Sequence, residues 1–238
     1  PISGIPDVLE AAYGGYLAVY SDTPNARRIT DGLGKEWETL NVGYKPHASV
    51  TSIHTALDGL ADILRENKLG AADVAKLEVG LSPMTHVHCA WEYKAQGVTA
   101  AQMNLYYGLA VIALDGMAFT DQYREDRLHD PRIFDFISRI TASVDAEIEK
   151  MGAPFRHAAR VTLTTRDGRR FEKLSLHRRG SPEAPLAPAD IEYKFKHVVG
   201  SCVDASRMTR IMDLVRGMEK LDNTGELLQL VAAPVNAH

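Results

Sequence analysis

The chain has 238 residues, of which 45% are hydrophobic and 24% are charged. This composition is typical of a globular protein, and the length is sufficient for one large domain or two small ones. The formal net charge of −4 excludes the strongly basic surface that binds nucleic acid or an anionic membrane, so we predict neither partner. No apolar run approaches the roughly 18 residues of a spanning helix, and the start PISGIPDVLE lacks the features of a signal peptide.

Two cysteines, Cys89 and Cys202, lie far apart in the sequence. In a chain long enough to form a full core, such isolated thiols are typical of a reducing compartment, and we predict a cytoplasmic location. The sequence begins at Pro1 without a methionine. We therefore expect a processed, cleaved or truncated polypeptide.

The first half of the chain changes from a loop-rich start to regular elements. Residues 5–40 mix a short helical pattern with loops. From about residue 52, apolar residues at spacings of three and four predict a helix that Thr51 or Ser52 caps and Gly70 closes. The alternating segment KLEVGLS then predicts a strand over 76–82.

A long apolar helix is predicted over 98–119, buried on more than one side. A second helix begins after Asp130, which suits the N-cap, with Pro131 at the first helical position. Two alternating runs flank Asp167-Gly168, a pair that predicts a hairpin with a type I′ turn.

The Pro-rich segment 178–190 predicts a connection between domains, and helices over 188–199 and 203–220 precede a tail of small residues. The order is helical, then mixed, then helical again. It predicts an α+β fold with segregated parts, not a doubly wound parallel sheet. The sequence contains no G-x-G-x-x-G, Walker, H-E-x-x-H or C-x-x-C motif, and we predict no cofactor.

The segment GYKPHASVTSIH (43–54) contains the first candidate site. Lys45 precedes a helix N-terminus, where free N–H groups and the helix dipole favour an anion, so it suits a carboxylate or phosphate. A solvated lysine in a Pro-containing turn is the more common interpretation. His54, at the start of the helix, is more often a buried polar residue than a base.

Two tyrosines, Tyr106 and Tyr107, lie in the apolar helix. Core packing is the more common interpretation of such tyrosines. A buried tyrosine hydroxyl nevertheless needs a hydrogen-bond partner. A tyrosine hydroxyl that reaches a cleft serves as a proton donor or an oxyanion stabiliser.

Two further groups of polar residues are weaker candidates. His86 and His88 would share one face of a strand beside Cys89, but no third ligand follows at a useful spacing, so metal binding is the minor alternative. In the charged loop 121–132, Arg124 or Arg127 would admit an acidic substrate if the loop is not simply solvated.

Six segments follow one another along the chain: GIPDVLEAAYGGYL, GYKPHASVTSIHTALDGLADIL, DVAKLEVGLS, AAQMNLYYGLAVIALDG, HDPRIFDFISRI and RVTLTTRDGRRFEKL. In this order they resemble the MmgE/PrpD family, which includes 2-methylcitrate dehydratase, cis-aconitate decarboxylase and iminodisuccinate epimerase. The resemblance covers about residues 3–222.

The resemblance implies a large helical domain and an α/β lid domain inserted into it. On this chain, residues 1–40 would end the helical domain and connect it to the lid, 41–185 would form the lid, and 186–238 would return to the helical domain. The acid/base histidine and the aspartate of the family belong to the N-terminal helical half, which full-length members carry before this region. We therefore expect a fragment, or a separate chain that supplies that half, and no activity of this chain alone.

Site residues follow from the resemblance one by one. Lys45 matches a lysine that faces the cleft, and Tyr107 matches a cleft tyrosine through the Y-x-x-A-x-x-x-x-D-G spacing; we predict both as catalytic, and Lys45 also as substrate-binding. His54 matches a histidine common in the same segment and is predicted to bind substrate. Cis-aconitate decarboxylases carry an active-site histidine five residues after the lysine, where this chain has Val50, which argues against decarboxylation. His47, close by, is the residue that would compensate, and we predict it to bind substrate.

The implied activity is that of a metal-independent lyase, a hydro-lyase of the 2-methylcitrate dehydratase kind, or of an epimerase or other isomerase. Such an enzyme abstracts a proton α to a carboxylate of a small di- or tricarboxylic acid. The alternative is a non-catalytic binding or assembly subunit with the lid fold. Apolar faces in FKHVVGSCV and IMDLVRGMEKL lead us to expect association with the missing half or a homo-oligomer such as a homodimer.

Overall fold

The computed structural model describes residues 4 and 6–232, and the chain divides into two units, residues 1–42 and 43–238. The described part of the first unit contains two short helices and a 3-10 helix, separated by loops, as the sequence predicts. None of these three helices buries a side chain. They are α1 (Tyr16–Tyr20), α2 (Arg27–Thr30) and η1 (Glu38–Asn41).

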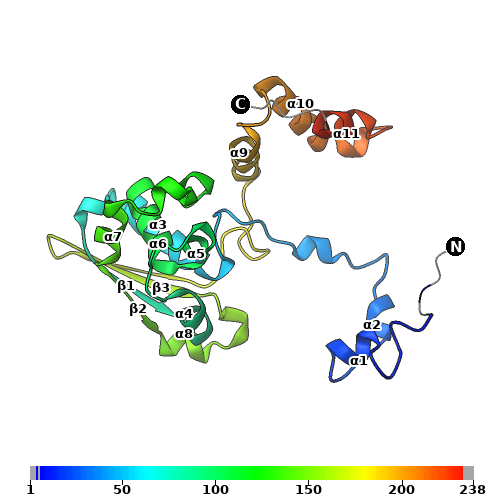
Figure 1. The fold of residues 1–238 in the computed structure, drawn as a ribbon, viewed down its shortest axis with the longest axis horizontal. Coiled ribbons are helices and arrows are strands. Elements are labelled where there is room, and N and C mark those ends of the chain that lie inside the picture. Colours follow the sequence, from blue (N-terminus) through cyan, green and yellow to red (C-terminus); the bar gives the residue numbers. More distant parts are fainter. Residues whose placement is uncertain (1–3, 5, 233–238) are drawn as a thin grey trace. The chain divides into compact units, whose positions relative to one another are not determined.

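The second unit contains a four-stranded sheet with helices around it, so the predicted α+β fold is confirmed. Figure 1 shows its elements along the colour gradient from cyan to red. In chain order they are η2 (Thr51–Ile53), α3 (His54–Asn67), η3 (Ala71–Asp73), β1 (Val74–Leu81), α4 (Pro83–Cys89), α5 (Val98–Met103), α6 (Leu105–Asp115), η4 (Thr120–Tyr123), η5 (Glu125–Arg127), α7 (Pro131–Ile137), β2 (Ile140–Val144), α8 (Ala146–Lys150), η6 (Ala153–Phe155), β3 (Ala159–Thr165), β4 (Arg170–Ser175), α9 (Pro188–Val199), α10 (Ala205–Arg216), η7 (Met218–Lys220) and α11 (Gly225–Ala232).

The sheet has the strand order β2-β1-β3-β4. β1 and β2 are parallel, and Leu77 lies opposite Ile140, whereas β3 is antiparallel to both of its neighbours. β1 was expected from its alternation, but β2 was not. Five residues directly after a short helix carry too little alternation to be recognised, and β2 is held in place by the strand beside it.

The hydrophobic core lies between the sheet and helices α3 and α6 (Figure 1). α3 packs against β3, β4 and α6. Its residues Leu57 and Leu60 are fully buried, as are Leu109 of α6 and Leu77 of β1. Because α6 is apolar nearly all round, it is buried between α3 and α7.

Two helix boundaries differ from the predictions. α3 has no side-chain cap from Thr51 or Ser52, and it ends at Asn67, where Lys68 rather than Gly70 adopts the left-handed conformation. The predicted helix over 98–119 is interrupted at Asn104. Its side chain accepts a hydrogen bond from the Tyr107 amide (3.0 Å), so a polar cap inside an apolar run starts a new helix.

The hairpin between β3 and β4 is confirmed, but its predicted type I′ turn is wrong. Within the turn, Gly168 has a positive φ of 87° and Asp167 does not. The amide of Gly168 donates to the carbonyl of Thr165 (3.0 Å), and the amide of Thr165 donates to the carbonyl of Arg169 (2.9 Å). These bonds describe a longer loop in which one glycine supplies the left-handed residue.

The C-terminal region contains α9 and α10 as expected, but also α11, where the sequence analysis placed a tail of small residues. The remaining tail, 233–238, lies outside the described residues. Asp204 caps α10 by accepting a hydrogen bond from the Arg207 amide (2.9 Å). The capping explains why this helix forms here although few of its side chains are buried.

One glycine allows the segments around Tyr44 and Gly180 to cross closely. The amide of Tyr44 donates to the carbonyl of Gly180 (2.7 Å). Gly180 has a φ of 89°, and a Cβ atom there would lie 1.9 Å from the Tyr44 carbonyl oxygen. Only glycine allows this close crossing, which fixes where the chain leaves the sheet and where α9 begins.

No helix within residues 4 and 6–232 combines the length and the apolar character needed to cross a membrane.

Candidate functional site

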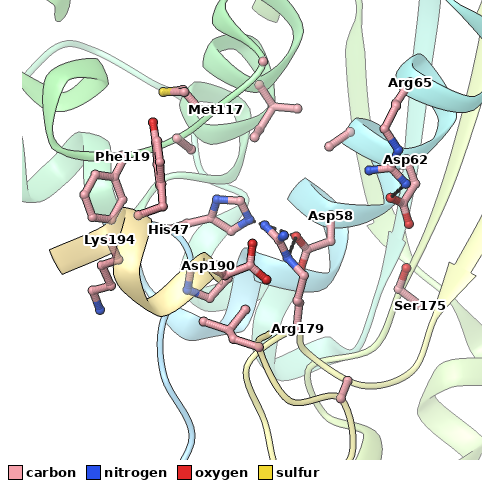
Figure 2. Close-up of a pocket in the computed structure, with 18 of the residues that line it drawn as sticks. His47, Asp58, Asp62, Arg65, Met117, Phe119, Ser175, Arg179, Asp190 and Lys194 are labelled. Carbon is pink, nitrogen blue, oxygen red and sulfur yellow. Dashed lines mark hydrogen bonds and ion pairs between the residues drawn. The ribbon is translucent and has the colours of Figure 1, made fainter. Parts of the chain in front are cut away.

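A cavity of about 550 Å³ lies beside α3. Its wall combines the segment before α3, one face of α3, the loop after α6, the segment after β4 and the first turns of α9. Figure 2 shows the labelled side chains His47, Asp58, Arg179 and Asp190 pointing toward one another in this pocket. The polar side chains that line it are His47, Asp58, Asp62, Arg65, Ser175, His177, Arg179, Asp190, Tyr193 and Lys194.

Strong charges in the pocket are balanced. Three carboxylates, Asp58, Asp62 and Asp190, face three side chains that are always cationic at neutral pH, namely Arg65, Arg179 and Lys194. Asp62 is held by Arg65 at 2.5 Å and by Lys173 at 2.7 Å, and both cations keep the pKa of Asp62 below its usual value despite burial.

The polar centre of the pocket is a contact between His47 and Asp58. Nε2 of His47 lies 3.0 Å from Oδ1 of Asp58, and the His47 side chain is 6% exposed. Nε of Arg179 lies 3.3 Å from the same oxygen. Oδ2 of Asp58 is buried without a hydrogen-bond partner. The carboxylate of Asp58, carried by α3, is thus contacted both from the segment 46–47 and from the loop after β4.

Lys45 and His54 meet at a single backbone carbonyl instead of in the pocket. Nζ of Lys45 donates to the Ser49 oxygen (3.2 Å), and Nε2 of His54 lies 3.3 Å from the same atom. His54 is 1% exposed, and its Nδ1 has no partner. Burial, reinforced by the nearby His47, lowers the pKa of His54 to about 3, so its ring is neutral at physiological pH.

The predicted catalytic tyrosine lies in an aromatic cluster. Tyr107 is fully buried, its hydroxyl donates to the carbonyl of Gln122, and its ring lies 4.9 Å from that of Tyr93 and 5.4 Å from that of Tyr123. Burial raises the pKa of Tyr107 well above its usual value. The hydroxyl therefore stays protonated, as a hydrogen-bond donor must.

Of the four predicted site residues, only His47 lines the pocket. His54 lies directly behind it, with the two rings edge to face at 5.1 Å between centroids. Lys45 is exposed beside the pocket, and Tyr107 is in the core. The roles of Lys45, His54 and Tyr107 stay predictions.

The structure places the two weaker candidates as follows. His86 and His88 do not share a strand face, because Ser82 caps the helix α4 and Pro83 begins it. Within the described residues, no group of three or more His, Cys, Asp or Glu side chains could hold a metal ion. Arg127 joins Asp115 (2.7 Å) to Asp130 (2.6 Å) and so ties the end of α6 to the start of α7.

Sequence reasoning missed Asp58 and Arg179. Asp58 follows His54 by four residues, so the two lie on one face of α3, a spacing that carried a signal. Arg179 belongs to the segment HRRG, which was interpreted only as part of a connection. Its proximity to α3 depends on the crossing at Gly180, which no local pattern shows.

Comparison with known families now identifies the chain. Residues 47–220 match the model of the MmgE/PrpD C-terminal domain. The chain belongs to the MmgE/PrpD family. The match includes His47, α3, the whole sheet and helices α9 and α10, and the resemblance predicted from the six segments is confirmed.

Curated relatives of this MmgE/PrpD chain come from filamentous fungi. A cis-aconitate decarboxylase of Aspergillus terreus is 27% identical over 97% of the chain, and the homologue from strain NIH 2624 is 28% identical over 97%. The cis-aconitate decarboxylase-like protein oryM of Aspergillus oryzae is 27% identical over 96%. In each case the chain spans about half the length (50%) of the relative.

Proposed function

We propose that this chain is the C-terminal part of a lyase that acts on a small di- or tricarboxylic acid. The observation that carries the proposal is the alignment of 97% of the chain with a protein named cis-aconitate decarboxylase, within the MmgE/PrpD family. The histidine-containing pocket supports it, since a histidine that reaches a cavity suits proton transfer.

The chemistry of such an acid begins at the carbon next to a carboxylate. The proton on that carbon is weakly acidic, so cations and hydrogen-bond donors must stabilise the charge that develops when it leaves. In our proposal, Lys45 holds a substrate carboxylate, and the Tyr107 hydroxyl donates to the developing charge or the leaving group. In this chain both groups make backbone contacts, which substrate or a further part of the protein would have to replace.

The finer reaction is a choice between loss of carbon dioxide, loss of water and epimerisation. The names of the relatives favour decarboxylation of a substrate like cis-aconitate. Val50, in place of the expected histidine, favours dehydration of a substrate like 2-methylcitrate, or epimerisation, unless His47 compensates. We propose decarboxylation as the first reaction to test and dehydration as the second.

The test uses the native protein that contains this chain, incubated with cis-aconitate or with 2-methylcitrate in D₂O. Product NMR separates the three reactions, because decarboxylation shortens the carbon skeleton, dehydration introduces a double bond into an unshortened skeleton, and epimerisation inverts a stereocentre without either change. Release of carbon dioxide or water supports the proposal. A protein that binds these acids without converting them would instead be the non-catalytic subunit.

Matched variants test the two predicted residues in the active protein. Lys45→Ala removes a charge-assisted hydrogen bond and should raise KM by about tenfold or more, whereas Lys150→Ala, at the exposed end of α8, should have no effect. Tyr107→Phe should lower kcat. Its control is Tyr93→Phe, which removes a buried hydroxyl that also donates to a carbonyl (Leu128, 3.0 Å). Equal losses in both tyrosine variants would make Tyr107 a packing residue.

A further inference from the structure

His47 and Arg179 both contact Asp58, and the three side chains differ in how far solvent reaches them. Nε2 of His47 and Nε of Arg179 both point at Oδ1 of Asp58, at 3.0 Å and 3.3 Å. The exposed fraction of the side chain rises from 6% for His47 to 16% for Asp58 and 49% for Arg179. The pair of His47 and Asp58 is thus shielded from water, and the arginine is the member that solvent reaches.

The contact decides which nitrogen of His47 carries hydrogen. An ionised carboxylate accepts hydrogen bonds and cannot donate them, so Nε2 must be the N–H donor. The lone pair of the neutral ring is then on Nδ1, for which the structure gives no hydrogen-bond partner among the described residues. His47 also lines the pocket. A histidine that lines a cavity, with the position of its hydrogen fixed by a carboxylate, is an arrangement that suits a general base.

Several charged or titratable groups surround His47. Asp58 is the nearest charge. His54, whose ring lies 5.1 Å away, is neutral and adds no competing positive charge. Lys45 lies beyond the Ser49 carbonyl. The other charged or titratable groups on the same pocket wall are Asp62, Arg65, His177, Asp190, Tyr193 and Lys194.

We propose that His47 is the residue of this chain that takes the proton from substrate carbon, and that Asp58, fixed by Arg179, is a positioning residue for it. The inference rests on the proposed function and names the base at its site. In dehydration or epimerisation, the two reactions that break a C–H bond, the Nδ1 lone pair forms a bond with the proton of the carbon next to a carboxylate. The electron pair of the broken C–H bond stays on the substrate as an enolate, and Asp58 stabilises the imidazolium that results.

The first experiment measures the tautomer of His47 in the 238-residue chain by long-range ¹H–¹⁵N NMR. We expect hydrogen on Nε2 and a bare Nδ1. Asp58→Asn replaces the acceptor with an amide that also donates, so the Nδ1–H form should appear. Asp62→Asn changes the same charge one turn later on α3, in the same pocket, and should leave the tautomer unchanged. Hydrogen on Nδ1 in the unmodified chain would overturn the inference.

The second experiment measures kinetics in the native protein that contains this chain. His47→Gln should lower kcat by about 100-fold or more with little change in KM, the usual contribution of a general base. Asp58→Asn should cause a smaller loss. It should also move the acidic limb of the pH–rate profile to lower pH, because the ring loses the negative charge that stabilises its protonated form. Arg179→Met, at an exposed position, removes a positive charge near the ring and should move the acidic limb in the opposite direction, to higher pH.

The outcomes separate this inference from the proposed function. Turnover that survives His47→Gln overturns the assignment of His47 and leaves the lyase intact. An equal effect of Asp58→Asn and Asp62→Asn on the pH–rate profile overturns the positioning role of Asp58. Absence of any conversion by the unmodified native protein overturns both proposals.

Discussion

The region around the sheet and the C-terminal region α9–α11 differ in how far their apolar side chains are buried. Helix α3 buries most of its length against β3, β4 and α6, and α6 buries most of its length against α3 and α7. By contrast, α9 and α11 bury no side chain, and α10 buries Ile211 and Leu214. Large apolar side chains remain exposed there, including Leu228 at 60% and Val231 at 57%.

The comparison shows that helix formation and burial are separate events in this chain. The C-terminal helices have good local signals, such as Pro188 at the start of α9 and Asp204 as the cap of α10. Local signals establish a helix, whereas a core needs a second surface to pack against. Exposed apolar faces of this kind are typical of interfaces, and association through α9–α11 stays a prediction.

The largest expected effect tests the contrast in burial directly. Leu57→Ala would open a cavity between α3 and α6 and should lower the free energy of unfolding by about 3 kcal/mol. Leu228→Ala makes the same chemical change on α11, where the side chain is 60% exposed, and should change it by less than about 0.5 kcal/mol. Urea unfolding of the 238-residue chain measures both. Similar losses would show that α11 is covered in solution.

The next effect concerns the crossing that separates the two regions. Gly180→Ala places a Cβ atom against the Tyr44 carbonyl at a left-handed φ, and should cost about 2 kcal/mol or more through strain and collision. Gly168→Ala has a similar φ of 87° but meets no atom within 4 Å, so it should cost about 1 kcal/mol. Chemical denaturation compares them, and equal costs would mean that the crossing opens readily.

A smaller effect follows from a buried histidine of the sheet region. Because burial lowers the pKa of His54 from 6.5 to about 3, the unfolded chain binds more protons than the folded chain between these values. Stability should therefore fall as the pH falls from about 6.5 to about 3, by up to about 1.4 kcal/mol per pH unit from this residue. His54→Asn should flatten the dependence. His157, whose pKa burial lowers to about 4, should retain part of it.

The stability of the unmodified chain and of the His54→Asn variant would be measured by urea unfolding at several pH values. Equal slopes in both proteins would contradict the assignment of this dependence to His54.

What the sequence determined by itself was local. The periodicity of α3, the alternation of β1, the Asp130–Pro131 start of α7 and the Asp167-Gly168 hairpin each depend on neighbouring residues, and all four are present. Lys45 was singled out from one short segment before a helix, whereas His47 was singled out only through the family resemblance. Such features follow from backbone sterics, capping and side-chain spacing, which act over a few residues.

What only the tertiary structure decided was which distant segments meet. β2 forms because β1 is beside it, and Arg179 reaches Asp58 because the chain crosses itself at Gly180. Tertiary packing likewise places Tyr107 in a buried aromatic cluster and His47 on the wall of the pocket. These outcomes depend on packing between residues far apart in sequence, so no local sequence pattern predicts them. The same type of side chain serves as a core residue or as a base according to what surrounds it.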